Sequence, residues 1–140
     1  MPTQIYIYNE SYLLRIPRKR ITEAMLRASA AELATDATIR VIILNDTEIH
    51  ELNERYLSHD YPTDVITFAL ESAPIEGEIY IGAGVAVRQA KDYGVTLTDE
   101  LMRLTVHGVL HLAGYDDDTP EKRVQMSLLE TRYINVQPQI

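Results

Sequence analysis

The sequence predicts an α+β fold, with a mixed sheet of about four strands packed with helices and a metal site on a C-terminal helix and its following turn. Strand-like and helical patterns alternate in the first half, whereas the second half is mainly helical. With 46% apolar and 24% charged residues, a chain of 140 residues can bury a core. We expect residues 1–140 to form one domain, because no linker, repeat or low-complexity tract interrupts them.

Four stretches have the composition of β-strands. Residues 4–8 alternate and are rich in β-formers, and residues 38–44 are almost continuously apolar, which is typical of a strand covered on both faces. Residues 64–70 predict another buried strand, followed by a loop that contains Pro74. The stretch 77–81, GEIYI, is short, which favours an edge strand.

Helical spacing of apolar residues predicts five helices, each with a start or stop signal. Pro17 precedes the first, Asn45 with Glu48 three positions later caps the second, Thr96 or Thr98 caps the fourth, and Pro120 begins the last. The expected helices span about 18–34, 45–57, 85–93, 98–113 and 120–135.

The composition of the chain limits where the protein can be located and what it can bind. There is no cysteine, no apolar run of about 18 residues and no basic segment before an apolar one at the N-terminus, so we expect a cytoplasmic protein without a membrane partner. The net charge of −8 argues against indiscriminate nucleic-acid binding. Four basic residues nevertheless lie within six positions: Arg15, Arg18, Lys19 and Arg20. This cluster is either a local basic rim on an acidic protein or the solvated start of a helix.

The stretch 107–118, HGVLHLAGYDDD, carries the strongest chemical signal. His107 and His111 share one helix face at i and i+4, Gly114 can end the helix, and Asp117 can return to close the site. Three protein ligands with an open fourth position are typical of catalytic zinc, although nickel or another transition ion fits the same donors. Each ligating imidazole is expected to donate its other N–H to a carbonyl or carboxylate.

Other readings of these residues remain open. Two histidines on an apolar helix can be core histidines, and Asp116 and Asp118 compete with Asp117, which the spacing favours. By contrast, His50 has Glu54 one turn later and is expected to be a surface residue.

The ligand spacing also resembles that of metzincin peptidases, H-E-x-x-H-x-x-G-x-x-H. The position of their water-activating glutamate is Gly108 here, which argues against a peptidase.

A longer pattern resembles the YbeY family of bacterial endoribonucleases and rRNA maturation factors. It comprises HGVLHLAGYDDD, LNERYLSHDYPTDVITF at 52–68, GEIYI at 77–81, and Met126 and Glu130 in the last helix. The resemblance implies a zinc-dependent, single-strand-specific endoribonuclease in 16S rRNA 3′-end maturation and ribosome biogenesis. It implies one Zn²⁺ held by His107, His111 and Asp117, with both histidines catalytic. Its partners would be single-stranded RNA or rRNA and the ribosome or its small subunit, not DNA.

The sequence departs from the family pattern at two positions. Asp117 stands where the third ligand is usually histidine; a carboxylate also binds zinc, but it lowers the net charge of the site by one and should make a bound water less acidic. Leu57 stands where many members have an arginine that serves catalysis or RNA binding, which leaves open how strongly this site catalyses and how it holds the phosphate. His59 could supply a cation or a proton. Thr63 and Asp64 are expected near the site, unless Asp64 only caps local backbone.

Two other functions fit these observations less well. One is a ribosome-assembly or RNA-binding factor with a mainly structural metal, which would show closed four-ligand coordination. The other is a metal-dependent hydrolase of another substrate, such as a peptide.

Overall fold

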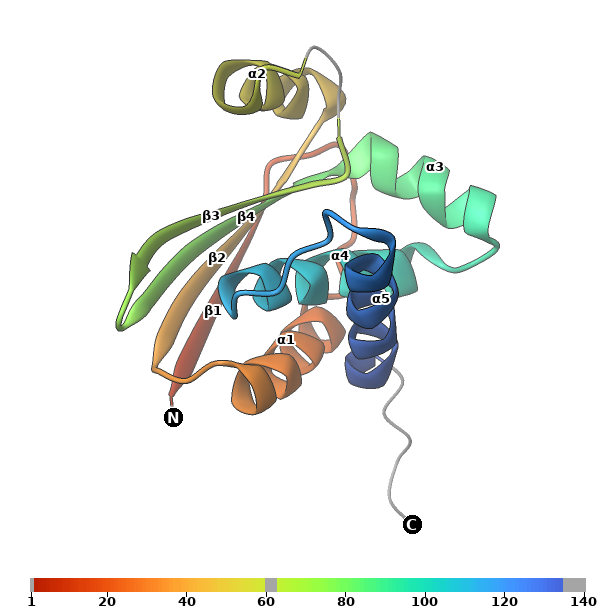
Figure 1. Cartoon of the computed structure of the whole chain (residues 1–140). Coiled ribbons are helices and arrows are strands. Elements are labelled where there is room, and N and C mark those ends of the chain that lie inside the picture. Colours follow the sequence, from red (N-terminus) through yellow and green to blue (C-terminus); the bar gives the residue numbers. More distant parts are fainter. Residues whose placement is uncertain (1, 60–62, 135–140) are drawn as a thin grey trace.

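The computed structural model describes residues 2–59 and 63–134 and contains the four expected strands and five expected helices in the expected order (Figure 1). Only residue 135 of the last expected helix lies outside the described residues. The elements are β1 Thr3–Asn9, α1 Arg18–Glu32, β2 Ala37–Leu44, α2 Asp46–Leu57, β3 Val65–Ser72, β4 Ile75–Gly82, α3 Ala83–Tyr93, α4 Leu97–Leu112 and α5 Pro120–Ile134.

The strands form one mixed sheet in the order β1-β2-β4-β3. β1 pairs parallel to β2, β2 pairs parallel to β4, and β3 pairs antiparallel to β4. Helices α1, α4 and α5 lie on one side of the sheet, while α2 lies beyond one end of it (Figure 1). The predicted α+β class with a four-stranded mixed sheet is confirmed.

The stretch 77–81 is not an edge strand. It belongs to β4, which is longer than predicted and lies between β2 and β3, so β3 and β1 form the edges. Ile75, Ile79 and Ile81 of β4 point into the core. Along β4, buried residues alternate with half-buried ones, which is the pattern of a strand with one buried face. The prediction was wrong because the length of a strand does not determine its place in the sheet, which depends on the strands that it pairs with.

The expectation that residues 38–44 are covered on both faces is also wrong. Along β2, buried residues alternate with half-buried ones. Ile39, Val41 and Ile43 are fully buried under the helices, whereas Arg40 and Ile42 on the opposite face keep part of their surface exposed. An apolar run therefore does not distinguish a strand with one covered face from one with two, because Ile42 is apolar but faces the less covered side.

Helix α4 is the central element of the helical layer and packs against α1, α3, α5, β3 and β4. Two glycines allow its close approach to the sheet. A Cβ on Gly108 of α4 would lie 2.5 Å from Cδ1 of Ile79, and a Cβ on Gly77 of β4 would lie 2.6 Å from Cδ1 of Leu112. Both distances are far below van der Waals contact, so larger residues would push α4 away from β4.

Local signals fix both ends of α4. At its start, the hydroxyl of Thr96 accepts a hydrogen bond of 3.0 Å from the Asp99 N–H, so Thr96 is the cap. At its end, Gly114 has φ of +103°, the Gly114 N–H donates to the His111 carbonyl, and the Tyr115 N–H donates to the Leu110 carbonyl. This is a Schellman motif, which reverses the chain directly after the two histidines.

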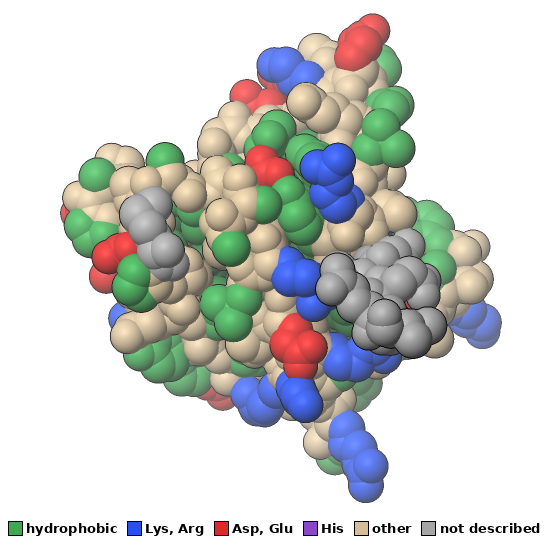
Figure 2. Space-filling model, turned by 90° about the horizontal axis from the view of Figure 1, so that it is seen from below, with side chains coloured by type: hydrophobic (Ala, Val, Ile, Leu, Met, Phe, Trp, Pro, Cys, Tyr) green, Lys and Arg blue, Asp and Glu red, His purple; other side chains and the backbone are tan. Residues whose placement is uncertain are grey.

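Positive charge is unevenly distributed over the surface. Of the 13 Lys and Arg residues, five lie within residues 15–27 and three lie in α5. Lys and Arg side chains gather, with acidic ones among them, on the face shown in Figure 2. Arg15, Arg18, Lys19 and Arg20 are all exposed, as a basic rim and a solvated helix start both require.

Over residues 2–59 and 63–134, no helix combines the length and apolar character needed to cross a membrane.

The contact between Gly108 and Ile79 predicts the effect of Gly108→Ala. The added methyl group would overlap Ile79, which costs about 1–3 kcal/mol, while the better helix propensity of alanine returns at most about 1 kcal/mol. We expect a lower midpoint of urea unfolding. The matched control is Ile79→Ala, because the double variant should lose less stability than the sum of the two single variants. An increase in stability for Gly108→Ala would contradict this packing.

Candidate metal centre

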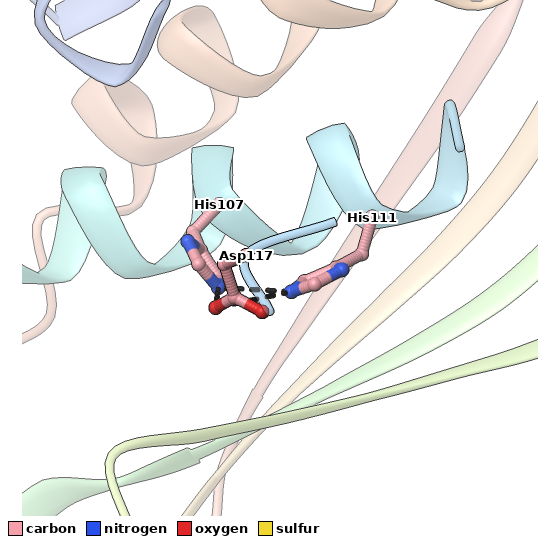
Figure 3. A group of neighbouring side chains, drawn as sticks. All are labelled: His107, His111 and Asp117. Atoms are coloured by element: carbon pink, nitrogen blue, oxygen red, sulfur yellow. Dashed lines mark hydrogen bonds and ion pairs between the residues drawn. The ribbon is translucent and has the colours of Figure 1, made fainter. Parts of the chain in front are cut away.

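Three side chains meet at one point beside the end of α4. His107 and His111 extend from the same side of the helix, and Asp117 reaches them from the following loop (Figure 3). The Nε2 atoms of the two histidines are 3.0 Å apart. Oδ2 of Asp117 lies 3.4 Å from Nε2 of His107 and 3.8 Å from Nε2 of His111. These are the three residues that the spacing predicted as ligands, and the structure brings them together as a group that could hold a metal ion.

The geometry of these atoms fits a metal ion. Ligands about 2.0–2.2 Å from a tetrahedral zinc ion lie about 3.3–3.6 Å from one another. The three observed separations, 3.0, 3.4 and 3.8 Å, lie around this range. Two imidazole nitrogens and one carboxylate oxygen are also donors that zinc and neighbouring transition ions accept. The group can therefore hold one metal ion.

Among the three consecutive aspartates, only Asp117 belongs to this group. Asp116 is exposed, and Oδ1 of Asp118 pairs with Nζ of Lys122 at 3.1 Å. Asp117 is part of a loop that is held at its start, because the hydroxyl of Tyr115 donates to Glu32 of α1 at 2.7 Å. The structure thus selects the carboxylate that the spacing favoured.

A buried carboxylate of α5 orients the first histidine. Oε2 of Glu130 lies 2.7 Å from Nδ1 of His107, and the Glu130 side chain is nearly completely buried. With the proton on Nδ1 donated to Glu130, Nε2 of His107 is left with a lone pair that faces His111 and Asp117. Glu130 therefore supplies the carboxylate that was expected behind a ligating imidazole.

Glu130 is itself held by a network of buried charges. Arg103 donates 3.0 and 2.7 Å hydrogen bonds to both oxygens of Glu100, and a 3.3 Å bond to Oε1 of Glu130. Burial disfavours the charged form of Arg103, but the two carboxylates outweigh it and raise the pKa of the guanidinium. The network links α4 to α5 and fixes the carboxylate behind His107.

The surroundings of His111 favour the neutral imidazole. Burial lowers the pKa of His111, and the neighbouring His107 lowers it further, against the opposing charge of Asp117. A hydrogen bond with the backbone of Tyr115 also engages the His111 ring. A lowered pKa favours the neutral imidazole, whose lone pair is available to a metal ion.

The three ligands open onto a cavity of about 710 Å³. This volume lies in the range of about 300–1,000 Å³ that is typical of ligand sites. Leu57 at the end of α2 and the Thr63–Asp64 segment line the same cavity. Asp64 also caps local backbone, because its Oδ1 accepts a 2.8 Å bond from the Val65 N–H, and its Oδ2 accepts a 3.2 Å bond from Gln89. Both expectations for Asp64 therefore hold.

Two histidines lie away from the metal group. His50 faces Glu54 across one helical turn at 3.8 Å, as expected for a surface residue. His59 is exposed and is not among the described residues that line the cavity. A role for His59 in the site therefore has no support from the described residues.

The roles of Glu130 and Arg103 were not predicted from the sequence. Glu130 appeared only as part of a family resemblance, without a function. A usable signal was present in α5, because Met126, Glu130 and Tyr133 are the buried residues of that helix, and a glutamate on a buried stripe requires a partner.

The position of Glu130 predicts a specific effect on metal affinity. Glu130→Gln keeps the shape but removes the negative charge behind His107, and loss of such a partner weakens metal binding about 10- to 100-fold. Zinc affinity can be measured by competition with a chromophoric chelator. Glu121→Gln, which changes an exposed residue of the same helix, is the control and should leave affinity unchanged. Equal affinities for both variants would refute the role of Glu130.

Known proteins resemble this chain over nearly its full length. A family model described as Endoribonuclease YbeY matches residues 7–137. A Chlorobaculum parvum protein named Endoribonuclease YbeY is 39% identical over 142 residues, covering 96% of this chain and 94% of that protein. A protein of the same name from Bacillus licheniformis is 40% identical, covering 86% of this chain and 87% of that protein.

A solved structure agrees with these sequence matches. The solution structure of TM1509 from Thermotoga maritima superimposes with a TM-score of 0.67 at 30% identity, covering 94% of this chain and 87% of that one. The resemblance predicted from the sequence is therefore confirmed, and the chain belongs to the family described as Endoribonuclease YbeY.

Proposed function

We propose that this protein is a zinc-dependent endoribonuclease that cuts single-stranded RNA. The observation that carries the proposal is the convergence of His107, His111 and Asp117 on one point of an open cavity, in a chain whose relatives are named Endoribonuclease YbeY. In this proposal residues 1–140 act as one catalytic domain, and the two histidines are catalytic as well as metal ligands.

The residues of the cavity have separate tasks. His107, His111 and Asp117 would hold the ion, and Glu130 keeps the His107 lone pair directed at it. Zinc bound there would polarise a phosphoryl oxygen and lower the pKa of a water toward about 7. Both carboxylate oxygens of Asp64 accept hydrogen bonds from within the protein, which hold this side chain in place at the cavity wall.

The cavity wall suits an unpaired nucleotide. Tyr93 lines the cavity and is 60% exposed, and an aromatic ring offers a stacking surface to any base. A base within a duplex is already stacked on its neighbours, so an unpaired strand would use such a ring at lower cost.

Two features support the nuclease over its alternatives. Gly108 packs against Ile79 in the core, so a glutamate could not take the position that a metzincin peptidase uses to activate water. Among the described residues the metal group has three protein ligands, which leaves a coordination position for water or substrate, as in catalytic rather than structural zinc sites.

We further propose rRNA as the substrate, in 16S rRNA 3′-end maturation during ribosome biogenesis, with the small ribosomal subunit as the partner. This rests on the family to which the chain belongs. It implies that the protein works in the cytoplasm, where the ribosome is assembled. The direct test is cleavage of a 16S rRNA precursor, free and within small subunits, with mapping of the 3′ ends.

His111→Ala should abolish zinc uptake and RNA cleavage together, because two remaining ligands hold zinc weakly. Zinc content is measured by mass spectrometry and cleavage with a labelled single-stranded RNA. His50→Ala is the matched control, because His50 is a helix histidine outside the site. Full cleavage by zinc-free His111→Ala protein would refute the proposed zinc-dependent nuclease.

Asp117→Ala should also lose zinc and cleavage, whereas Asp118→Ala should keep both. Asp118 is an adjacent carboxylate that pairs with Lys122 instead of facing the histidines. The two variants therefore differ only in which aspartate is removed. Stoichiometric zinc in Asp117→Ala protein would show that Asp117 is not a ligand.

A further inference from the structure

Of the described residues that line the cavity, two carry a guanidinium group, Arg103 and Arg123. Arg103 already makes three hydrogen bonds to Glu100 and Glu130, whose side chains are 1% and 5% exposed. Its charge is balanced within the protein, and moving it would remove the ion-pair partner of buried Glu100 and leave Glu130 with His107 alone. Arg103 is therefore a structural cation and is not available to a ligand.

Arg123 is in a different situation. It lies in the first turns of α5, is exposed, and donates one hydrogen bond of 3.3 Å, to the backbone carbonyl of Asp117. Asp118 is the nearby acidic residue; its carboxylate hydrogen-bonds Lys122 and also feels the charge of Arg123, but it forms no ion pair with Arg123. In the part of the chain that the structure describes, no carboxylate lies within ion-pair distance of Arg123. Most of its five N–H donors therefore remain available for a ligand.

The cavity needs such a cation if its ligand is an anion. Asp64, Asp117 and Glu130 place three carboxylates on its wall, and Leu57 at the end of α2 contributes an apolar, half-exposed side chain. Zinc bound to Asp117 would offset part of this negative charge, but a phosphodiester that lies beside the metal ion would be held better by a cation of its own. Arg123 supplies that charge next to the loop that carries a metal ligand.

We propose that Arg123 forms a phosphate-binding subsite beside the metal centre and holds a phosphodiester of the RNA strand next to the one that is cut. This inference rests on the proposed nuclease function and names the residue that binds its substrate. A guanidinium suits the task because its planar donors can bind two phosphate oxygens at once. The backbone contact with Asp117 sets its distance from the metal ligands.

The test measures RNA binding and cleavage by Arg123→Gln in zinc-loaded protein. Binding of a fluorescein-labelled, phosphorothioate-linked single-stranded RNA is followed by anisotropy over a range of salt concentrations. Loss of one phosphate contact should reduce the slope of log K against log salt by about 0.7. In cleavage of unmodified RNA, KM should rise about tenfold, which is the effect expected from losing one charge-assisted hydrogen bond.

Two further variants separate phosphate binding from other effects of the charge. Arg132→Gln removes the same side chain from the last turn of the same helix, outside the cavity, and should leave slope and KM as in the wild type. Arg123→Lys keeps the charge, and should keep the salt slope while regaining only part of the affinity.

The outcomes distinguish a failure of the phosphate subsite from a failure of the proposed nuclease function. If Arg123→Gln and Arg132→Gln have the same salt slope and KM, the subsite is wrong. If both Arg123→Gln and Arg123→Lys lose zinc, Arg123 only supports the Asp117 loop, and the subsite is again wrong. If the zinc-loaded wild type binds the RNA but does not cut it, the proposed nuclease function fails, whereas the salt slopes still test the subsite.

Discussion

The close contact of α4 with β4 is the constraint on which the site depends. Gly108 packs against Ile79, and Gly77 packs against Leu112, so the helix lies on the sheet with one fixed face inward. Successive helix residues are about 100° apart around the axis, so fixing Gly108 also fixes the direction of its neighbour His107. His111 follows one turn later on the same face. The two histidines of the candidate metal group are thus oriented by the packing of residues outside that group.

The second organising feature is the set of buried charges between α4 and α5. Glu100 and Glu130 are buried, and burying a charge is costly unless it is paired. Arg103 pairs with both, and Glu130 uses its other oxygen for His107. The same contacts therefore hold α5 in place and select the His107 tautomer. This explains why the last helix, which carries no metal ligand, forms part of the wall of the site.

Both departures from the family pattern have a place in this arrangement. Asp117 lies where the third ligand is expected, with its carboxylate oxygen close to both imidazoles, so the candidate metal group carries one negative charge more than a three-histidine group would. Leu57 lines the cavity but brings no cation to it. Among the described residues that line the cavity, the guanidinium without a carboxylate ion pair comes from α5 instead. The chain thus combines a more negative metal group with a cation from a different helix.

Features determined by nearby residues could be predicted from the sequence. The caps, the turn at Gly114, the shared helix face of the two histidines and the return of Asp117 all arise within about ten residues of chain, where backbone geometry leaves few alternatives. The mixed sheet also followed from the order of strands and helices. The central position of β4 did not, because strand order depends on pairing between distant segments.

Only the tertiary structure brought Glu130 to His107, 23 residues away, and placed Arg123 at the cavity. Their positions depend on how α5 packs against α4. A helical pattern in the sequence does not specify which other element the helix will pack against. The sequence determined which residues can bind a metal. The packing of α4 on the sheet and of α5 on α4 decided which groups orient those residues and placed Arg123 beside them.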